Sequence, residues 1–303
     1  MGTNYRITVV VAENLDLSHL EQQIIAQLQS VNQSMSTYLQ NSELSQFNRQ
    51  QANVQVELSE PLRAVISEAL EISELSQGAF DITVADAVRL WGFGADGIVT
   101  RRPSDQRIAE LKASSGYSNL TLETNRLSKA HSGTSIDLSG IAKGYAVDRV
   151  AQMLTASGVH DYLIDVGGEL RASGRNADQQ IWLIAIEKPQ MAGGIQQIVE
   201  LQDSAIATSG DYRNYLTIEG KKYSHTIDPV TLKPVFHRLA LVSVLSERAS
   251  RADALATALM VMGEDRAVEF AEQQDLAAYF VIRTDNDNQW VIKYTQKFAA
   301  ILR

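Results

Sequence analysis

The spacing of apolar residues along the chain changes repeatedly between the alternation of strands and the three-to-four-residue repeat of amphipathic helices. Residues 5–12 are a β-rich run that predicts a strand, and the apolar residues of about 17–31 recur at helical spacing. A second helix is predicted from Ser59 and Pro61, which suit an N-cap and a first turn, to near Gly78. The same criteria predict helices over 82–90, 104–113 and about 139–156, and a hairpin formed by 117–122 and 126–129.

Short strand patterns dominate from residue 161 onward, and turns containing Gly, Asp or Asn separate them. This density predicts an antiparallel meander made of the runs 161–166, 169–174, 181–187, 197–202, 205–209 and 214–219. The last third adds a helix over about 251–262, a further helix beginning near Glu264, and strands over 239–246, 277–283 and 290–295.

These elements together predict an α+β fold, in which a helical layer covers a mostly antiparallel sheet. We expect one domain over 1–303 with a smaller inserted subdomain, whose boundary the sequence does not mark.

Composition excludes several classes of function. A formal net charge of -9 argues against a nucleic-acid groove, which needs a surplus of Lys and Arg on one face. Cysteine is absent, so disulfides and thiolate metal sites are excluded and any metal must use oxygen or histidine ligands. No apolar run approaches the ~18 residues of a membrane span. The first residues lack a signal-peptide pattern, which fits either a leaderless chain or one whose targeting segment was removed.

The segment DLSGIAKGYAVD, residues 137–148, places small residues at a predicted helix entrance. Gly140 and Gly144 could belong to a loop that binds a phosphate, because helix-start amides attract anions. It is no Walker loop, since that pattern requires G-x-x-x-x-G-K-[ST]. Alternatively, the small residues let the helix pack closely on the sheet, with Asp137 as its N-cap.

Asp253 and Thr257 lie four residues apart, so on a helix both side chains share one face. A carboxylate and a hydroxyl are half of a site for a hard cation such as Mg²⁺, and a backbone carbonyl near Gly140 could add a third ligand. The alternative is structural, because Ser250 and Asp253 also fit a capping box.

His225 stands between a strand-like segment and an Asp-Pro turn, where its side chain would be held at an edge. An imidazole there could act as a general base, although a lone histidine is more often structural. A serine-hydrolase triad of Ser209, His225 and an aspartate is also conceivable. Elsewhere, residues 165–169 (DVGGE) predict a hairpin turn, and 78–81 (GAFD) predict a helix end followed by a new cap.

Taken in order, these stretches resemble the ApbE family of flavin transferases from end to end. The resemblance lies in MGTNYRI (1–7), MSTYLQNSELSQFN (35–48), GAFDITVADAVRLWGFG (78–94), DLSGIAKGYAVD (137–148), DVGGELRASG (165–174), ATSGDYRNY (207–215), SHTIDP (224–229) and ADALATALMVMG (252–263). Two residues depart from the family pattern: Ile82 replaces a proline that often follows F-D, and Leu232 replaces the glycine usual after D-P-x-T.

The resemblance implies an ApbE-like, T-fold-like architecture and a defined reaction. The family binds FAD with Mg²⁺, cleaves its pyrophosphate, and joins FMN by a phosphoester bond to a Thr or Ser hydroxyl of a target protein, releasing AMP. By motif position, the resemblance implies that His225 is the base that accepts the proton of the acceptor hydroxyl. The residues that it implies as FAD contacts are Met35, Ala79, Phe80, Asp81, Asp137 and Lys143. The residues that it implies as metal ligands are Gly140, Asp253, Ala256 and Thr257.

Two other outcomes stay open at this point. Some relatives hydrolyse FAD to FMN and AMP with the same metal, and a non-catalytic flavin-binding protein is a third class. Family members usually act at the periplasmic or extracytoplasmic face of the inner membrane, on subunits of membrane redox complexes such as sodium-pumping NADH:quinone reductase. We therefore expect FAD and an acceptor protein as partners, no nucleic acid, and no transmembrane segment within this chain.

Overall fold

The protein is described by a computed structural model covering residues 2–11, 15–190, 193–212, 214–285 and 289–303. Ala12, at the end of the predicted first strand, and Met1 and Arg213, within the resembling stretches, lie outside the described residues. The chain divides into two compact units. Unit 1 comprises Met1–Ser30, Ile141–Tyr212 and Arg238–Arg303, and unit 2 comprises Val31–Gly140 and Arg213–His237.

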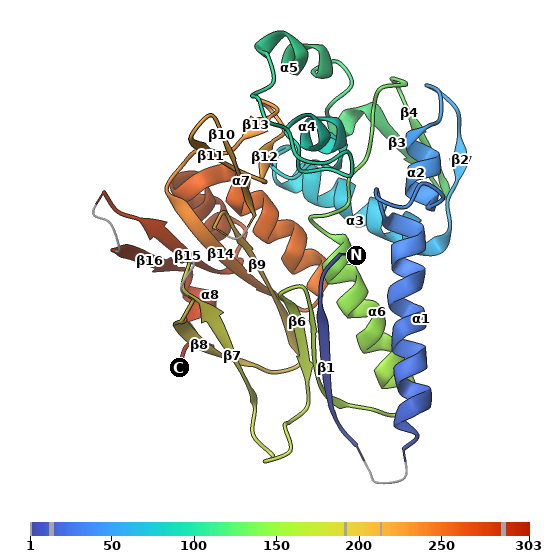
Figure 1. Cartoon of the computed structure of the whole chain (residues 1–303). Coiled ribbons are helices and arrows are strands. Elements are labelled where there is room, and N and C mark those ends of the chain that lie inside the picture. Colours follow the sequence, from blue (N-terminus) through green and yellow to red (C-terminus); the bar gives the residue numbers. More distant parts are fainter. Residues whose placement is uncertain (1, 12–14, 191–192, 213, 286–288) are drawn as a thin grey trace. The chain divides into compact units, whose positions relative to one another are not determined.

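Unit 1 is built on a seven-stranded sheet in the order β1-β5-β6-β9-β14-β15-β16, in which every described pairing is antiparallel (Figure 1). Its strands are β1 (Tyr5–Val10), β5 (Asp161–Val166), β6 (Glu169–Ser173), β9 (Ser204–Gly210), β14 (Leu239–Ser246), β15 (Ala277–Arg283) and β16 (Trp290–Tyr294). Six residues of β14 are buried in succession, which suits a central strand covered on both faces.

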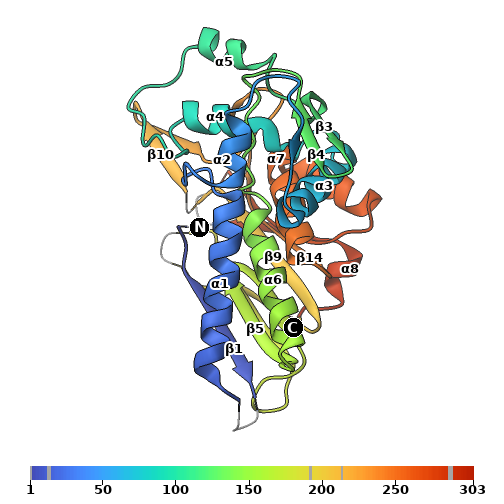
Figure 2. The ribbon, with the colours of Figure 1, turned by 90° about the vertical axis from the view of Figure 1, so that its right-hand side faces the viewer.

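Helices α6 (Ala142–Ala156) and α7 (Ala249–Gln273) pack against each other and against the sheet (Figure 2). They form the helical layer predicted from the sequence, and they carry small residues where they meet. Helix α1 (Leu17–Met35) runs from unit 1 into unit 2, and its apolar side chains Leu20, Ile24, Leu28 and Val31 are buried as the helical repeat predicts.

The predicted meander is wrong at one point. Strands β7 (Trp182–Glu187) and β8 (Ile195–Leu201) form a separate two-stranded sheet, and β6 pairs directly with β9. An isolated antiparallel bridge joins Val199 of β8 to Leu302 near the C-terminus. The buried side chains of this hairpin pack in one core with the large sheet and with α8 (Gln296–Ala299). Apolar alternation fixes which face of a strand is buried, but it does not fix the strand's neighbour.

The start of α7 also differs from the sequence interpretation. The Asp253 side chain does not return to Ser250 as a capping box, and the N-cap residue Arg248 has no side-chain cap. Instead, the carboxylate of Asp148 on α6 accepts the backbone N–H groups of Ala249 and Ser250, each at 3.0 Å. Within α7, Gly263 has a φ of 75°, which separates the two helices that the sequence predicts.

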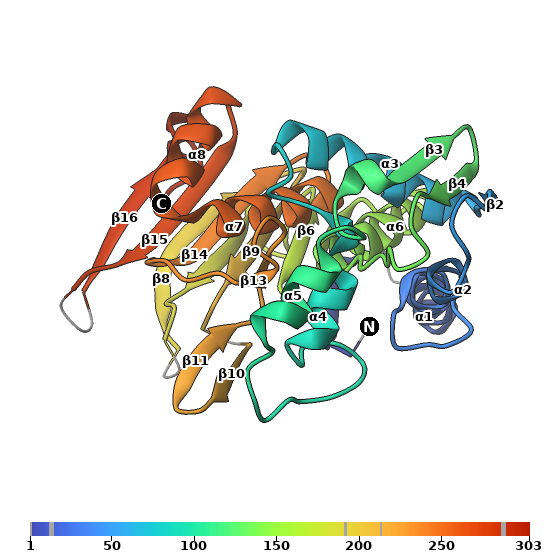
Figure 3. The same ribbon diagram turned by 90° about the horizontal axis from the view of Figure 1, so that it is seen from above.

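Unit 2 combines short helices with small sheets (Figure 3). The helices are α2 (Glu43–Asn48), α3 (Glu60–Leu75), α4 (Ala85–Leu90) and α5 (Asp105–Leu111), with 3-10 turns η1 (Ile82–Val84) and η2 (Tyr117–Asn119). The sheets are β2 (Val56–Glu57), β4 (Arg126–Lys129) and β3 (Leu120–Glu123) in that order, the hairpin β10 (Tyr215–Ile218) with β11 (Lys221–Ser224), and the hairpin β12 (Ile227–Asp228) with β13 (Lys233–Pro234).

An apolar cluster joins the late segment of unit 2 to the early one. Ile218, Ile227 and Leu232 pack with Ala87 of α4, with its C-cap residue Trp91 and with Ile108 of α5. The Trp91 indole N–H also donates to the Leu232 carbonyl at 2.9 Å. Burial of this cluster explains why residues 214–237 fold with a segment more than a hundred positions earlier in the chain. In the described part of the chain, no helix combines the length and apolar character needed to cross a membrane.

Candidate active site

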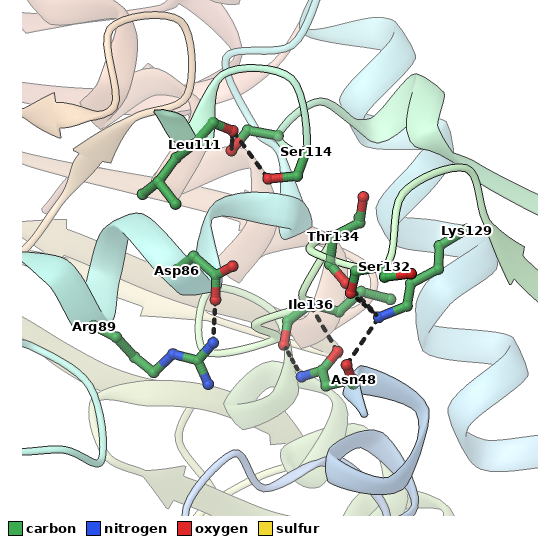
Figure 4. Close-up of polar contacts among 10 residues, drawn as sticks. Asn48, Asp86, Arg89, Leu111, Ser114, Lys129, Ser132, Thr134 and Ile136 are labelled. Atoms are coloured by element: carbon green, nitrogen blue, oxygen red, sulfur yellow. Dashed lines mark hydrogen bonds and ion pairs between the residues drawn. The ribbon is translucent and has the colours of Figure 1, made fainter. Parts of the chain in front are cut away.

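A buried lysine fixes the chain just before the predicted DLSG segment. The Lys129 ammonium donates to three backbone carbonyls, those of Asn48 at 2.8 Å, Ser132 at 3.1 Å and Thr134 at 2.8 Å (Figure 4). Burial lowers the pKa of Lys129, with the charge of Asp86 opposing. The Asn48 amide bonds both backbone groups of Ile136, accepting at 2.8 Å and donating at 2.9 Å. Unit 2 therefore holds residues 132–136 rigidly before Asp137 begins.

Asp137 closes a local turn and is not a helix cap, which corrects one sequence interpretation. Its carboxylate accepts the Ser139 backbone N–H at 2.7 Å, whereas α6 begins only at Ala142, with Ile141 as its N-cap residue. The backbone N–H of Asp137 donates to the Ile82 carbonyl at 2.7 Å. Two stretches of the family pattern, 78–94 and 137–148, are thus joined inside unit 2.

Asp81 is the cap predicted for the GAFD stretch. Its Oδ1 accepts the backbone N–H and the hydroxyl of Thr83 at 2.7 and 2.6 Å, and its Oδ2 accepts the Tyr117 N–H at 2.7 Å. Burial raises the pKa of Asp81, although these hydrogen bonds oppose the rise. Three further residues predicted to contact FAD are also buried in unit 2: Met35, Ala79 and Phe80.

The predicted base, His225, lies in unit 2 between β11 and β12. Its Nδ1 atom is 3.0 Å from the Asn214 carbonyl oxygen, and its ring meets Phe93 edge-on with centroids 6.4 Å apart. A carbonyl can only accept a hydrogen bond, so the neutral ring carries its proton on Nδ1 and its lone pair on Nε2. Ser209, the alternative nucleophile, lies in β9 of unit 1.

Three charged side chains gather in unit 1 where α6, α7 and β6 contact one another. The Nζ atom of Lys143, in the first turn of α6, lies 3.6 Å from Oδ2 of Asp253 and 3.5 Å from Oε1 of Glu169. Both carboxylates are almost fully buried, with exposed fractions of 5% and 4%. Oδ2 of Asp253 also accepts the Gly144 N–H at 3.1 Å. Unit 1 thus brings together two predicted site residues, Lys143 and Asp253.

Glu169 is the member of this cluster that is missing from the residues predicted above. It follows the β5–β6 hairpin turn, which the structure confirms through the positive φ angles of Gly167 and Gly168, 68° and 102°. One sequence signal was available, because Glu169 and Arg171 are oppositely charged residues two positions apart and therefore on one face of the strand. In the structure both side chains ion-pair with residues of α6.

Burial and the charge of Lys143 act in opposite directions on the pKa values of the two carboxylates. Burial raises the pKa of Glu169 to about 8 against the charge of Lys143, and Asp253 adds to the rise. Burial also raises the pKa of Asp253, and Lys143 opposes that effect. The pKa of Lys143 rises, because the two carboxylates outweigh its burial. One carboxylate oxygen, Oε2 of Glu169, is buried without a hydrogen-bond partner among the described residues.

The other predicted metal ligands are neutral oxygen donors, the type that a hard divalent ion accepts beside one carboxylate. Thr257 follows Asp253 by one turn of α7, and Ala256 beside it is buried. Gly140 ends unit 2 immediately before Ile141. Within the described ranges, no group of three or more His, Cys, Asp or Glu side chains forms a metal site. A cation bound by Asp253 would therefore need hydroxyl, carbonyl and substrate oxygens as its other ligands, as Mg²⁺ commonly does.

Gly144 serves close packing between helices. A Cβ atom at this position would overlap the backbone carbonyl of Ala249 at the start of α7. The small residue therefore lets α6 approach α7, rather than the sheet as the sequence interpretation had it. This approach also allows the Gly144 N–H to reach Asp253.

Replacing Gly144 with alanine is accordingly expected to destabilise the protein by about 1–3 kcal/mol, the typical cost of overpacking. The measurement is urea unfolding followed by circular dichroism. Gly133→Ala is the matched control, because a Cβ there would meet only the Ser114 side chain at ordinary distances of 3.4 and 3.5 Å. Equal unfolding free energies for the two variants would contradict the packing role of Gly144.

Comparison with known proteins identifies the family. The sequence model of the ApbE family matches residues 1–280. The chain belongs to the ApbE family. A curated relative from Haemophilus influenzae, named FAD:protein FMN transferase, is 41% identical over 94% of this chain and 85% of its own length. Relatives with the same name from Vibrio cholerae and Escherichia coli are 42% and 34% identical, over 94% and 98% of this chain and 86% and 87% of theirs.

Solved ApbE structures share the fold. The flavin transferase ApbE from Vibrio cholerae superposes with a TM-score of 0.92 at 39% identity, covering 100% of this chain and 96% of that one. The apo form of the Pseudomonas stutzeri flavinyl transferase ApbE gives 0.91 at 37% identity, covering 99% and 94%. These likenesses confirm the resemblance and the α+β fold with its mostly antiparallel sheet.

Leu232, one of the two departures from the ApbE pattern, adopts the backbone geometry of the glycine it replaces. Its φ is 56°, its side chain is buried, and its N–H donates to the Asp228 carbonyl at 2.7 Å. The left-handed conformation costs a side-chain-bearing residue roughly 1–2 kcal/mol. Burial of the leucine in the cluster around Trp91 offsets this cost.

Comparing two substitutions separates these effects. Leu232→Ala loses the buried side chain and keeps the strain, so we expect destabilisation of about 2–5 kcal/mol. Leu232→Gly loses the side chain but relieves the strain, and should be less destabilising than alanine by about 1 kcal/mol. Thermal and urea unfolding of both variants measure the difference. A glycine variant as unstable as the alanine variant, or more so, would contradict the strain assigned to Leu232.

Proposed function

We propose that this chain transfers FMN from FAD to an acceptor protein. The observation that carries the proposal is the near full-length identity, 41% and 42%, with proteins named FAD:protein FMN transferase. In the reaction, a Thr or Ser hydroxyl of the acceptor forms a bond to the FMN phosphorus. The pyrophosphate bond of FAD breaks, AMP leaves, and the hydroxyl proton passes to a base.

His225 is the base in this proposal. The Nδ1 contact with the Asn214 carbonyl orients the ring and leaves Nε2 as its proton acceptor. A general base of this kind typically contributes a factor of about 10²–10⁴ in rate. Phosphoryl transfer needs little more from the protein than a positioned nucleophile and neutralised phosphate charge, so one base and one cation are sufficient.

Mg²⁺ is the proposed cofactor, held by the Asp253 carboxylate, the Thr257 hydroxyl and the backbone carbonyls of Gly140 and Ala256. When bound, such an ion neutralises the pyrophosphate and the developing charge on its oxygens. Support comes from the buried side chains of unit 1, where two carboxylates face one ammonium and Oε2 of Glu169 has no hydrogen-bond partner among the residues that the structure describes. A cation bound there would offset the cost of burying the ionised carboxylates, whose pKa values burial raises.

FAD is the proposed substrate, bound by Met35, the Ala79 and Phe80 backbone, Asp81, Asp137 and Lys143. In support, Asp81 and Asp137 are linked through η1, and the DLSG segment is anchored by Asn48 and Lys129. Family resemblance further suggests action at the periplasmic or extracytoplasmic face of the inner membrane, on subunits of membrane redox complexes.

One assay tests the proposed function. The protein is mixed with FAD, Mg²⁺ and an acceptor domain carrying a flavinylation motif, and the products are weighed by mass spectrometry. AMP released in a one-to-one ratio with flavinylated acceptor supports FMN transfer. If AMP and free FMN form and the acceptor stays unmodified, the protein is an FAD hydrolase. If FAD stays intact, the protein is a non-catalytic flavin-binding protein.

A further inference from the structure

Lys143 stands beside the carboxylate that the proposed cation would use. Its ammonium is 3.6 Å from Oδ2 of Asp253 and 3.5 Å from Oε1 of Glu169. The two distances are nearly equal and both exceed the usual 2.7–3.2 Å of an N–H···O hydrogen bond, so neither carboxylate is the preferred partner. The lysine is therefore shared between two acceptors that come from two different elements, β6 and α7.

The Glu169 carboxylate can accept more hydrogen bonds from the Lys143 ammonium than it does in this structure. Only its Oε1 lies beside Lys143, whereas its Oε2 is buried and has no hydrogen-bond partner within the described part of the chain. Asp253, by contrast, is also engaged by the Gly144 N–H at 3.1 Å. A shift of the Lys143 ammonium toward Glu169 would satisfy a buried acceptor that otherwise costs free energy.

The Lys143 ammonium and a divalent ion would compete for the Asp253 carboxylate. A lysine ammonium and a divalent ion within a few ångströms of each other repel strongly where the carboxylates around them are buried. The flexible four-carbon stem of a lysine allows the ammonium to move without backbone change. Gly167 gives this stem room, since a Cβ there would come within 3.3 Å of Lys143 Cδ.

We propose that Lys143 is the internal counter-ion of Asp253 before a divalent cation binds, and that Glu169 receives the Lys143 ammonium when the cation takes Asp253. Glu169 is then a positioning residue, which acts through Lys143 and does not touch the ion. The identity of the cation rests on the proposed function. The exchange predicts that the affinity for the divalent cation depends on Lys143.

Titration of the full chain with Mn²⁺ alone, followed by electron paramagnetic resonance of the free ion, tests this exchange without nucleotide or turnover. Lys143→Met removes the competing ammonium, so Mn²⁺ affinity is expected to rise about tenfold or more. Glu169→Gln leaves Lys143 with Asp253 as its sole anionic partner in the cluster, so affinity should fall about 10–100-fold. Lys293→Met, an exposed lysine on β16, is the control and should bind like the wild type.

The double variant identifies how Glu169 acts. In the Lys143→Met background, Glu169→Gln should reduce Mn²⁺ affinity much less than it does in the wild type, because no ammonium is left for Glu169 to bind. The proposal would be overturned if Glu169→Gln reduced Mn²⁺ affinity equally with and without Lys143→Met. It would also be overturned if Lys143→Met alone bound Mn²⁺ more weakly than the wild type. Anomalous diffraction from crystals soaked in Mn²⁺ adds a direct reading: Nζ should lie at hydrogen-bond distance from Glu169 and away from Asp253. Coordination of Mn²⁺ by Glu169 would refute the positioning role.

The same preparations separate this proposal from the proposed function. A wild type that transfers FMN to the acceptor but shows none of these Mn²⁺ effects overturns the exchange alone. A wild type that shows the Mn²⁺ effects and transfers no FMN overturns the proposed function and leaves the exchange standing.

Discussion

Replacing Asp253 with asparagine is expected to reduce kcat/KM for FMN transfer by at least about a hundredfold, which is about 2.7 kcal/mol. Asp253 is the sole carboxylate among the four proposed metal ligands, so the variant removes the one full negative charge that faces the ion. Asparagine keeps the shape of the side chain and an oxygen that accepts the Gly144 N–H. Transfer rates and Mg²⁺ affinity are measured together across a range of Mg²⁺ concentrations.

Loss of folding is not the expected cause of this defect. Burial raises the pKa of Asp253, so its ionised form is less stable in the folded protein than in the unfolded chain. A neutral asparagine avoids that cost at neutral pH, and its unfolding temperature should not fall. Asp265→Asn, an exposed acid on the same helix, is the matched control and should transfer normally. An Asp253→Asn variant with transfer within threefold of wild type would exclude the metal role.

The elements that the sequence predicts correctly are those set by local chemistry. The turn at 165–168 follows from two adjacent glycines, which accept positive φ, and the break within α7 follows from Gly263. The 3-10 turn after Phe80 begins at Asp81 because a short carboxylate can accept the N–H two positions on. In each case the deciding partner lies within a few residues.

The errors arise where the deciding partner is remote in sequence. The capping box at Ser250 failed because Asp148, about a hundred residues earlier, already caps α7. Asp253 was thereby left to face Gly144 and Lys143. Local spacing pointed to Asp253, and the family resemblance pointed to Lys143, but neither could show that the two side chains meet. Glu169 was missed for the same reason, since only sheet register and helix packing bring it beside Lys143.

Replacing His225 with alanine is expected to lower the rate of FMN transfer about 10²–10⁴-fold and to leave FAD affinity within about twofold. The imidazole contacts the Asn214 carbonyl and Phe93, both in unit 2, so its removal deletes a proton acceptor while the predicted FAD and metal ligands keep their side chains. Covalent flavin fluorescence on a denaturing gel measures transfer, and quenching of free flavin fluorescence measures binding.

A matched control makes the histidine result specific. His131→Ala removes an exposed imidazole from the same unit, and we expect normal transfer from it. If His225 acts as the base, its alanine variant should also regain transfer at high pH, where more of the acceptor hydroxyl ionises without help. A His225 variant that binds FAD normally and labels the acceptor at the wild-type rate would remove the base from the proposed mechanism. A variant that loses FAD binding as well would instead make His225 a substrate-binding residue, because a base that acts only on the acceptor hydroxyl contributes nothing to the affinity for the nucleotide.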